Sequence, residues 1–233
     1  MQATVVETRE VAKGTLLVTF AVENYPEYRP GAYFWVELPN RGHDDEKGLR
    51  RHISLVTSPT EGVVGLATRL RDSAFKRTLA ELQVGDEVVV EEPKGSFLLP
   101  EDTDEKYVFV AGGIGITVFR SMLRYVRDKG LPYEVTLVYS NRDRESAAFL
   151  DELEELEGDV PGLKVVLTMT DDEGWEGEAR RIDAELLRDH LGDLGGYHFL
   201  VAGPPEMTDA VVDALDSAGV PEAQVLAGKF SGY

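Results

Sequence analysis

Residues 111–117 read AGGIGIT and follow the apolar run YVFV. Glycines let a backbone approach a phosphate closely, and the helix start after such a turn offers free N–H groups and a positive dipole end. Gly112, Gly113 and Gly115 would form the turn, and Thr117 would add a hydroxyl in the first helical turn. The same glycines would also suit a plain strand-to-helix turn with close backbone contacts. The fingerprint G-x-G-x-x-G is incomplete, because a valine stands at its third glycine position.

The stretch YSNRDR, residues 139–144, follows the next apolar strand. In a dinucleotide-binding domain this position meets the adenosine ribose, and an acidic residue here would select NADH. Ser140 and Arg142 instead offer a hydroxyl and a guanidinium, which suit the 2′-phosphate of NADPH. A solvated turn, with its arginines paired to Asp143 and Glu145, is the alternative.

A third turn, AGPPEM, covers residues 202–207. Gly203 and Pro204 predict a rigid turn at the carboxyl end of a strand, with proline near a helix start where its missing N–H costs nothing. A simple helix start explains this pattern equally well. Its position is what suggests a ligand, because open α/β sheets bind ligands at the carboxyl ends of their strands.

Two stretches of the first half could bind an anion. Residues 50–59, RRHISLVTSP, place Arg51 just before a strand that carries Ser54, which suits a phosphate next to a polar ring. Residues 69–79, RLRDSAFKRTL, place Ser73 as a helix N-cap ahead of free backbone amides. A charged strand end and an ordinary helix cap are the corresponding structural explanations.

These residues require two kinds of framework. Before residue 100, short β-branched and aromatic runs alternate with turns such as RPGA and VGDE, and one short helix starts after Ser73. After residue 105, apolar strands alternate with amphipathic helices. We therefore predict an antiparallel β-barrel in residues 1–100. For residues 106–233 we predict an α/β domain with a five-stranded parallel sheet and helices on both faces.

Composition excludes several classes of function. The formal net charge of −19 disfavours a nucleic-acid partner, and the absence of cysteine rules out cysteine-ligated clusters and thiolate zinc sites in these 233 residues. The four histidines lack metal-ligand spacing, so we expect no metal site. No apolar run reaches the roughly 20 residues of a membrane span, and the N-terminus has no secretory pattern, so we expect a cytoplasmic protein. The acidic charge favours a halophilic one, because molar salt screens surface repulsion.

Taken together, these stretches resemble the ferredoxin–NADP reductase superfamily over nearly the whole chain. The family motif R-x-[YF]-[ST] corresponds to residues 51–54, so the resemblance implies FAD binding by Arg51, His52, Ile53 and Ser54. Arg51 would meet the pyrophosphate and Ser54 the flavin near N5. Thr57 would add a polar contact to the flavin. The resemblance further implies phosphate binding at Ser73. It also implies pyridine-nucleotide binding by the following residues: Gly112, Gly113, Gly115, Thr117, Ser140, Arg142, Gly203 and Pro204.

The sequence departs from the family at three places. Ile53 stands where an aromatic residue usually stacks on the flavin, and strand alternation would point His52 to the other face. Ala202 stands at the position of a cysteine close to the reacting nicotinamide. The chain ends in KFSGY, where Phe230 or Tyr233 would cover the flavin and move aside for nicotinamide.

The resemblance implies a flavoprotein oxidoreductase that passes hydride from NADPH, or NADH, to FAD. Electrons would then go to an acceptor such as ferredoxin or flavodoxin. Two alternatives stay open: an NAD(P)H:flavin reductase or oxygenase reductase component, and a non-catalytic subunit that senses the nicotinamide pool.

Overall fold

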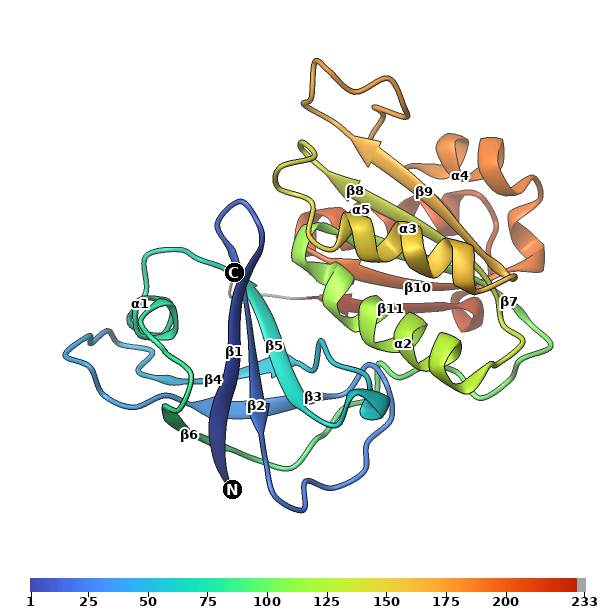
Figure 1. Ribbon diagram of the computed structural model, residues 1–233. Helices are drawn as coiled ribbons and strands as arrows, with labels where there is room; N and C mark the ends of the chain where they lie inside the picture. The colour runs from blue at the N-terminus through green and yellow to red at the C-terminus, as the bar shows by residue number, and fades with distance from the viewer. Residues whose placement is uncertain (230–233) are drawn as a thin grey trace.

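The computed structural model describes residues 1–229, and each half of the chain forms one sheet (Figure 1). The first sheet has six antiparallel strands in the order β4-β3-β6-β1-β2-β5. Its elements are β1 (Gln2–Ala12), β2 (Thr15–Ala21), β3 (Tyr33–Glu37), β4 (Arg50–Ser54), β5 (Val64–Arg69), β6 (Glu87–Val90) and the helix α1 (Ala74–Ala80).

Alternation of side chains builds the core of this first domain. In β3, Phe34 and Val36 are fully buried while Tyr33 and Trp35 lie on the outer face, as the period of two of a strand requires. The two outer strands meet beyond β4, where Val56 N donates to Gly65 O at 2.9 Å. The sheet thus curls around its buried side chains, and the predicted antiparallel barrel with one short helix is confirmed.

The second sheet is parallel and has the strand order β11-β10-β7-β8-β9. Its strands are β7 (Lys106–Gly112), β8 (Glu134–Asn141), β9 (Leu163–Met169), β10 (His198–Gly203) and β11 (Val225–Lys229). The chain moves from β7 to β8 on one side and later returns to β10 on the other. The carboxyl end of β7 is therefore the topological switch point, where open α/β sheets bind ligands.

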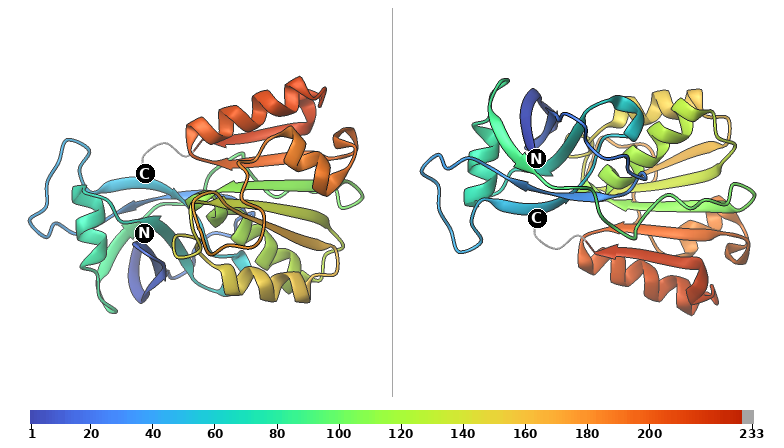
Figure 2. Two further views of the ribbon diagram at one scale, coloured as in Figure 1. Left: turned by 90° about the horizontal axis from the view of Figure 1, so that it is seen from above. Right: turned by 90° about the horizontal axis from the view of Figure 1, so that it is seen from below.

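Helices cover both faces of this sheet, as predicted (Figure 2). They are α2 (Ile116–Lys129), α3 (Leu150–Asp159), α4 (Ala184–Leu191) and α5 (Pro205–Ser217). Phe109 and Leu137 pack on the side of α2 and α3, whereas Val110 and Val138 pack on the side of α4 and α5. Within residues 1–229, no helix is long and apolar enough to cross a membrane.

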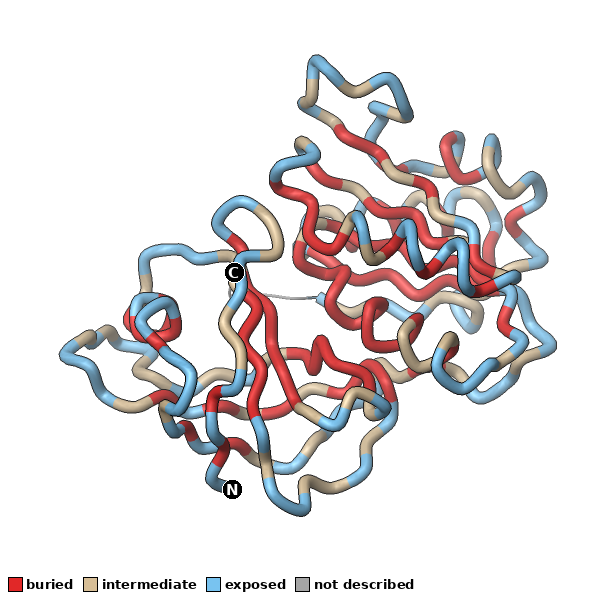
Figure 3. The backbone as a smooth tube through the Cα atoms, viewed as in Figure 1, coloured by how far each residue is buried: buried red, intermediate tan, exposed pale blue. Residues whose placement is uncertain are grey.

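The two domains share a hydrophobic core, which fixes their relative position. Leu17, Val56 and Ala67 of the barrel belong to the same buried cluster as Phe119 and Met122 of α2. Figure 3 shows buried residues in β2 and β5 of the barrel as well as in the parallel strands. Gly31 packs against this junction with φ +96°, and a Cβ atom there would lie 2.3 Å from the carbonyl oxygen of Phe97, so the position needs glycine.

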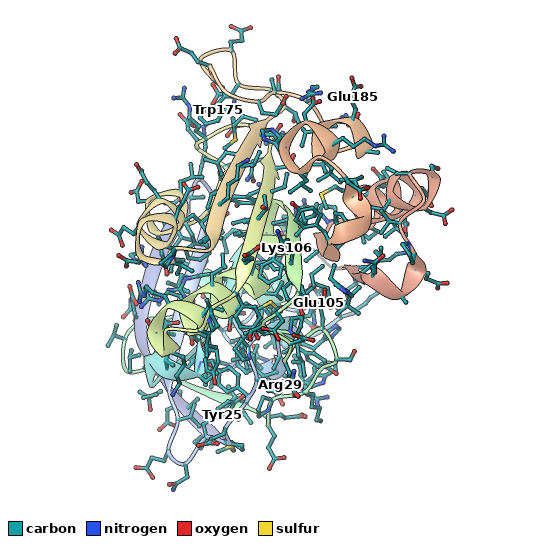
Figure 4. All side chains as sticks on the ribbon, turned by 90° about the vertical axis from the view of Figure 1, so that its right-hand side faces the viewer. Tyr25, Arg29, Glu105, Lys106, Trp175 and Glu185 are labelled. Atoms are coloured by element: carbon teal, nitrogen blue, oxygen red, sulfur yellow. The ribbon has the colours of Figure 1, made fainter. Side chains whose placement is uncertain are left out.

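Arg29, which is labelled in Figure 4, attaches the linker between the domains to the barrel. Its Nη2 donates to Leu99 O at 2.8 Å, and its Nη1 lies 2.9 Å from Glu101 Oε1. The hydroxyl of Tyr133, on the α/β side, donates to Pro100 O. Both domains thus hold the linker, which limits rotation between them.

Candidate functional site

A cavity of about 360 Å³ lies between β4, α1 and the carboxyl end of β11. Both domains contribute to its wall. Four of the residues predicted to bind FAD at β4, together with the predicted cap Ser73, line it: Arg51, His52, Ile53, Ser54 and Ser73. Other lining residues are Gly31, Tyr33, Lys47, Thr68, Phe75, Lys76, Gly95, Ser96, Phe97, Gly228 and Lys229.

Arg51 is held in place by its own loop. Its Nη1 donates to the carbonyls of Lys47 at 2.6 Å, Gly48 at 3.0 Å and Arg50 at 2.8 Å. Its Nη2 is buried and makes no hydrogen bond among residues 1–229, although Asp45 Oδ1 lies 3.8 Å away. A buried, unsatisfied guanidinium nitrogen costs free energy unless an oxyanion binds it. This atom therefore fits a phosphate group.

Lys76 adds a second buried cation to the same wall. Burial, with a smaller contribution from the positive charges of Arg71 and Arg51, lowers the pKa of Lys76 to about 8. Like charges gather in a protein interior when an anion compensates them. Arg51 and Lys76 line the cavity, whereas Arg71 is exposed and lies outside its lining; the positive charges of Arg51 and Lys76 suit the two charges of a pyrophosphate.

The start of α1 already binds an anion of the protein. Ser73 caps the helix, as predicted, and its Oγ accepts from Lys76 N at 3.3 Å. The carboxylate of Asp45, from the loop before β4, accepts from Ala74 N at 2.7 Å. This hydrogen bond is the main cause that lowers the pKa of Asp45. Asp45 thus occupies part of the position predicted for phosphate.

The aromatic side of the cavity comes from β3 rather than β4. Ile53 packs partly against the barrel core, whereas the His52 ring contacts Tyr33 at 5.7 Å and Trp35 at 5.0 Å between ring centroids. The expected separation of His52 from Ile53 is therefore observed. Tyr33 is the register partner of Ser54, so the two share a face. Tyr33 was not predicted from the sequence, although the alternation of residues along AYFWVEL indicates which face of the strand it occupies.

Thr57 does not line this cavity, contrary to the contact expected from the sequence. It is 2% exposed, and its carbonyl accepts from Tyr28 Oη at 3.1 Å and Ser121 Oγ at 2.7 Å. The chain turns toward α2 after β4, so Thr57 belongs to the domain junction. Its polar groups fix the two domains rather than face the cavity.

The glycine-rich turn follows β7 at the switch point. Its glycines are needed for two different reasons, close contacts and backbone conformation. A Cβ atom at Gly115 would lie 2.2 Å from Ala202 O, and one at Gly112 would lie 2.2 Å from Met207 Sδ. These two glycines allow close contacts, as the structural alternative requires. Gly113 has φ +51°, a left-handed conformation that favours glycine. Thr117 is 3% exposed and its hydroxyl donates to Ile114 O at 3.0 Å, so its proton is engaged within the turn.

The turn after β10 lies beside the glycine-rich turn. Gly203 approaches Gly112 so closely that a Cβ atom would lie 3.2 Å from its Cα, and Pro204 directly precedes α5. Ala202 is fully buried and does not line the cavity. Ala202 is thus buried at the end of β10, and its expected place close to the nicotinamide stays a prediction.

Two arginines follow the end of β8, and they differ in their side-chain partners. Arg144 pairs with Asp172, with Nε 3.0 Å from Oδ2, rather than with Asp143 or Glu145. Arg142 is exposed and its side chain has no hydrogen bond or ion pair among residues 1–229. Ser140 is half-buried on the same strand end. Arg142 is thus available for an anionic ligand at the predicted place.

The predicted residues Phe230 and Tyr233 lie outside the described part of the chain. Lys229, at the end of β11, lines the cavity and pairs with Asp209, with Nζ 2.6 Å from Oδ1.

Comparison with known proteins agrees with this geometry. Residues 109–213 match the model of the oxidoreductase NAD-binding domain family. The reductase component of propane 2-monooxygenase from Rhodococcus jostii is 27% identical over 216 residues, which are 88% of this chain and 56% of that protein. Methane monooxygenase component C from Methylosinus trichosporium is 32% identical over 164 residues, 70% of this chain and 46% of that protein. The chain thus spans about half the length of these relatives.

Solved structures extend the likeness to both domains. The ferredoxin reductase in carbazole 1,9a-dioxygenase is 26% identical with a TM-score of 0.82, over 99% of this chain and 69% of that one. A ferredoxin NADP+ reductase from Neisseria gonorrhoeae, solved with bound FAD and NADP, shares the fold with a TM-score of 0.82 at 20% identity, over 98% of both chains. The barrel and the α/β domain define a two-domain nucleotide-binding reductase fold. The chain belongs to the ferredoxin–NADP reductase superfamily.

Proposed function

We propose that this chain is a flavin-dependent oxidoreductase module that binds FAD and NAD(P)H and passes electrons to a partner protein. The proposal rests mainly on the cavity that both domains line and on the buried Nη2 of Arg51 in its wall. Bound FAD would supply the redox chemistry, hydride from nicotinamide C4 to flavin N5 followed by release of single electrons. The chain itself would bind and orient the two nucleotides.

Individual residues would have separate tasks. Arg51 and Lys76 would hold the pyrophosphate of FAD, and Ser54 would give the flavin ring a hydroxyl from a position that is 5% exposed. Tyr33, next to Ser54 across the strands, would supply the aromatic contact that Ile53 lacks. The shared core and the ion pairs at the junction would hold the nicotinamide and flavin sites at a constant distance, which hydride transfer requires.

For the electron acceptor, we propose a class of protein. The relatives named above include the reductase component of propane 2-monooxygenase and component C of methane monooxygenase, which favours an oxygenase or ferredoxin-type partner over free flavin. Flavodoxin is the other acceptor that we propose. These 233 residues contain no cysteine, so electrons would leave to another protein or domain rather than to a cysteine-ligated cluster in this chain.

The nucleotide preference follows from Arg142. A free guanidinium at the end of β8, with no acidic residue in the YSNR segment, supports NADPH over NADH. The halophilic and cytoplasmic setting expected from the sequence stays a prediction. Its support is the net charge of −19, and melting temperatures that rise from low to molar salt would be the corresponding measurement.

Flavin retention tests the proposed function. Purified protein incubated with FAD should stay yellow through gel filtration, with one flavin per chain. An NAD(P)H:flavin reductase that uses flavin as a diffusing substrate would lose the colour on the column. A protein that takes up no FAD at any concentration would contradict the proposal. Reduction of an artificial dye by NADPH would separate an enzyme from a subunit that only senses nicotinamide.

A further inference from the structure

The loop between β3 and β4 lies along α1 at the outer end of the barrel (Figure 2). Residues 39–48 form this loop, which we call the strap. Its two ends meet where Leu38 N donates to Leu49 O at 3.0 Å. The base of the strap is thus fixed by the sheet, whereas its position over α1 depends on the contacts that its own residues make.

Two side chains hold the strap to the carboxyl end of α1. Arg41 Nη1 donates to Glu81 O at 2.9 Å, and its Nη2 pairs with Asp86. His43 Nε2 lies 2.8 Å from Glu81 Oε1. A cation is favourable at the carboxyl end of a helix, where backbone carbonyls lack partners. Arg41 and His43, which we call the latch, both lie outside the cavity lining.

The other part of the strap occupies donors that the cavity would need for an anion. The carboxylate of Asp45 accepts from Ala74 N at 2.7 Å. The carbonyls of Lys47 and Gly48 accept from Arg51 Nη1 at 2.6 Å and 3.0 Å. The oxygens of a phosphate would require the same N–H groups. The strap and a bound pyrophosphate therefore compete for these donors.

We propose that the strap is an autoinhibitory segment that must leave Ala74 and Arg51 before the pyrophosphate of FAD binds. The inference rests on the proposed function, because it assumes that FAD binds in this cavity. A closed and an open strap are then two states of the protein, and FAD stabilises the open one. The apparent dissociation constant of FAD equals the intrinsic constant divided by the fraction of open protein. The latch sets this fraction.

FAD titrations of latch variants test the proposal, because the expected change is opposite to that of simple charge attraction. Loss of a cation near the site would weaken the binding of an anion. We instead expect Arg41→Met to lower the apparent dissociation constant of FAD about threefold to tenfold, because it releases the strap. His43→Leu should act in the same direction. Fluorescence titration of the apoprotein with FAD measures both.

Arg9→Met is the matched control. It removes the same charge from an exposed arginine of β1 that pairs with Glu7, away from the strap, and should leave the FAD affinity unchanged.

Hydrogen exchange reports on the strap in the absence of FAD. The amide of Ala74 is protected while Asp45 accepts from it, and opening of the strap exposes it to solvent. In the apoprotein, Arg41→Met and His43→Leu should therefore exchange the amides at the start of α1 several-fold faster than wild type. Arg9→Met should exchange them at the wild-type rate.

Several results would overturn the proposal. Weaker or unchanged FAD binding in Arg41→Met would show that the strap does not compete with FAD, and equal tightening in Arg9→Met would assign the effect to charge. If Arg41→Met does not fold, His43→Leu decides by the same criteria. Wild-type exchange at the start of α1 in both latch variants would show that the latch does not hold the strap. A wild-type protein that binds no FAD would contradict the proposed function, whereas exchange in the apoprotein tests the latch independently.

Discussion

Arg120 of α2 and Glu61 of the barrel form a bidentate ion pair across the domain junction. Nη1 lies 3.0 Å from Oε2 and Nη2 lies 3.1 Å from Oε1. Arg120 also donates to Val56 O at 2.8 Å and to Glu152 Oε2 at 2.9 Å. Its side chain is only 6% exposed, so these partners compensate a charge that burial would otherwise make costly.

We predict that Glu61→Gln destabilises the protein by about 3 kcal/mol, because it leaves a buried guanidinium partly uncompensated. In a chain of this length, that corresponds to a melting temperature lower by roughly 10 °C. Glutamine keeps the oxygen that accepts from Ser58 N, so the local turn should persist. Thermal unfolding of the two proteins measures the difference.

Lys13→Gln is the matched control. Lys13 and Glu145 also pair between the domains, but their side chains are 75% and 71% exposed. Solvent screens such a pair, so its removal should leave the melting temperature nearly unchanged. Equal effects of the two substitutions would show that the buried pair is not what holds the junction.

Asp45→Asn should tighten FAD binding several-fold. The carboxylate of Asp45 sits at the first amide of α1 and near Arg51, where it would repel and compete with a phosphate. Fluorescence titration of apoprotein with FAD measures the affinity. Asp44→Asn removes the same charge from the neighbouring, exposed residue and should have little effect; a weaker affinity in Asp45→Asn would contradict the overlap of the two anion positions.

FAD affinity should fall as the pH rises above about 8. The pKa of Lys76 is lowered to about 8 by burial, so this lysine is charged below that pH and becomes neutral above it. An anion stabilises the charged form, so binding is strongest at pH 7 and weakens by up to roughly tenfold at higher pH. The Lys76→Met variant should bind more weakly at pH 7 and show a flatter profile. A wild-type affinity that is constant from pH 7 to 10 would exclude this role.

Gly115→Ala should prevent correct folding of the turn, whereas Gly158→Ala should be harmless or stabilising. The added Cβ at position 115 would lie 2.2 Å from the carbonyl oxygen of Ala202, and backbone must move to relieve the overlap. Gly158 lies in α3 with open space around its Cα, and alanine favours a helix by about 0.5–1 kcal/mol. The melting temperatures of the two variants test this prediction. Equal melting temperatures for Gly115→Ala and Gly158→Ala would refute the close contact at Gly115.

Local sequence patterns predicted most of the fold. Apolar strands that alternate with amphipathic helices predicted the parallel sheet, and Ser73 predicted the start of α1, because these signals depend on near neighbours in sequence. The same local reasoning placed Arg51 and Ser54 together, since both belong to one strand.

The remaining site residues depend on contacts between distant segments. Asp45 reaches α1 only because its loop folds back, and Arg120 meets Glu61 only because the two domains pack together. Thr57 and Ala202 are both buried and lie outside the lining of the cavity. Position in a motif does not show whether a side chain faces the cavity or the domain junction.

The most direct test of the account is an anaerobic titration of the flavin-loaded protein with NADPH and, separately, with NADH. The account predicts that the yellow absorbance bleaches with about one nucleotide per flavin, and faster with NADPH because of Arg142. Equal rates with both nucleotides would contradict the role of Arg142. A bound flavin that stays fully oxidised with both would contradict the proposed hydride transfer itself.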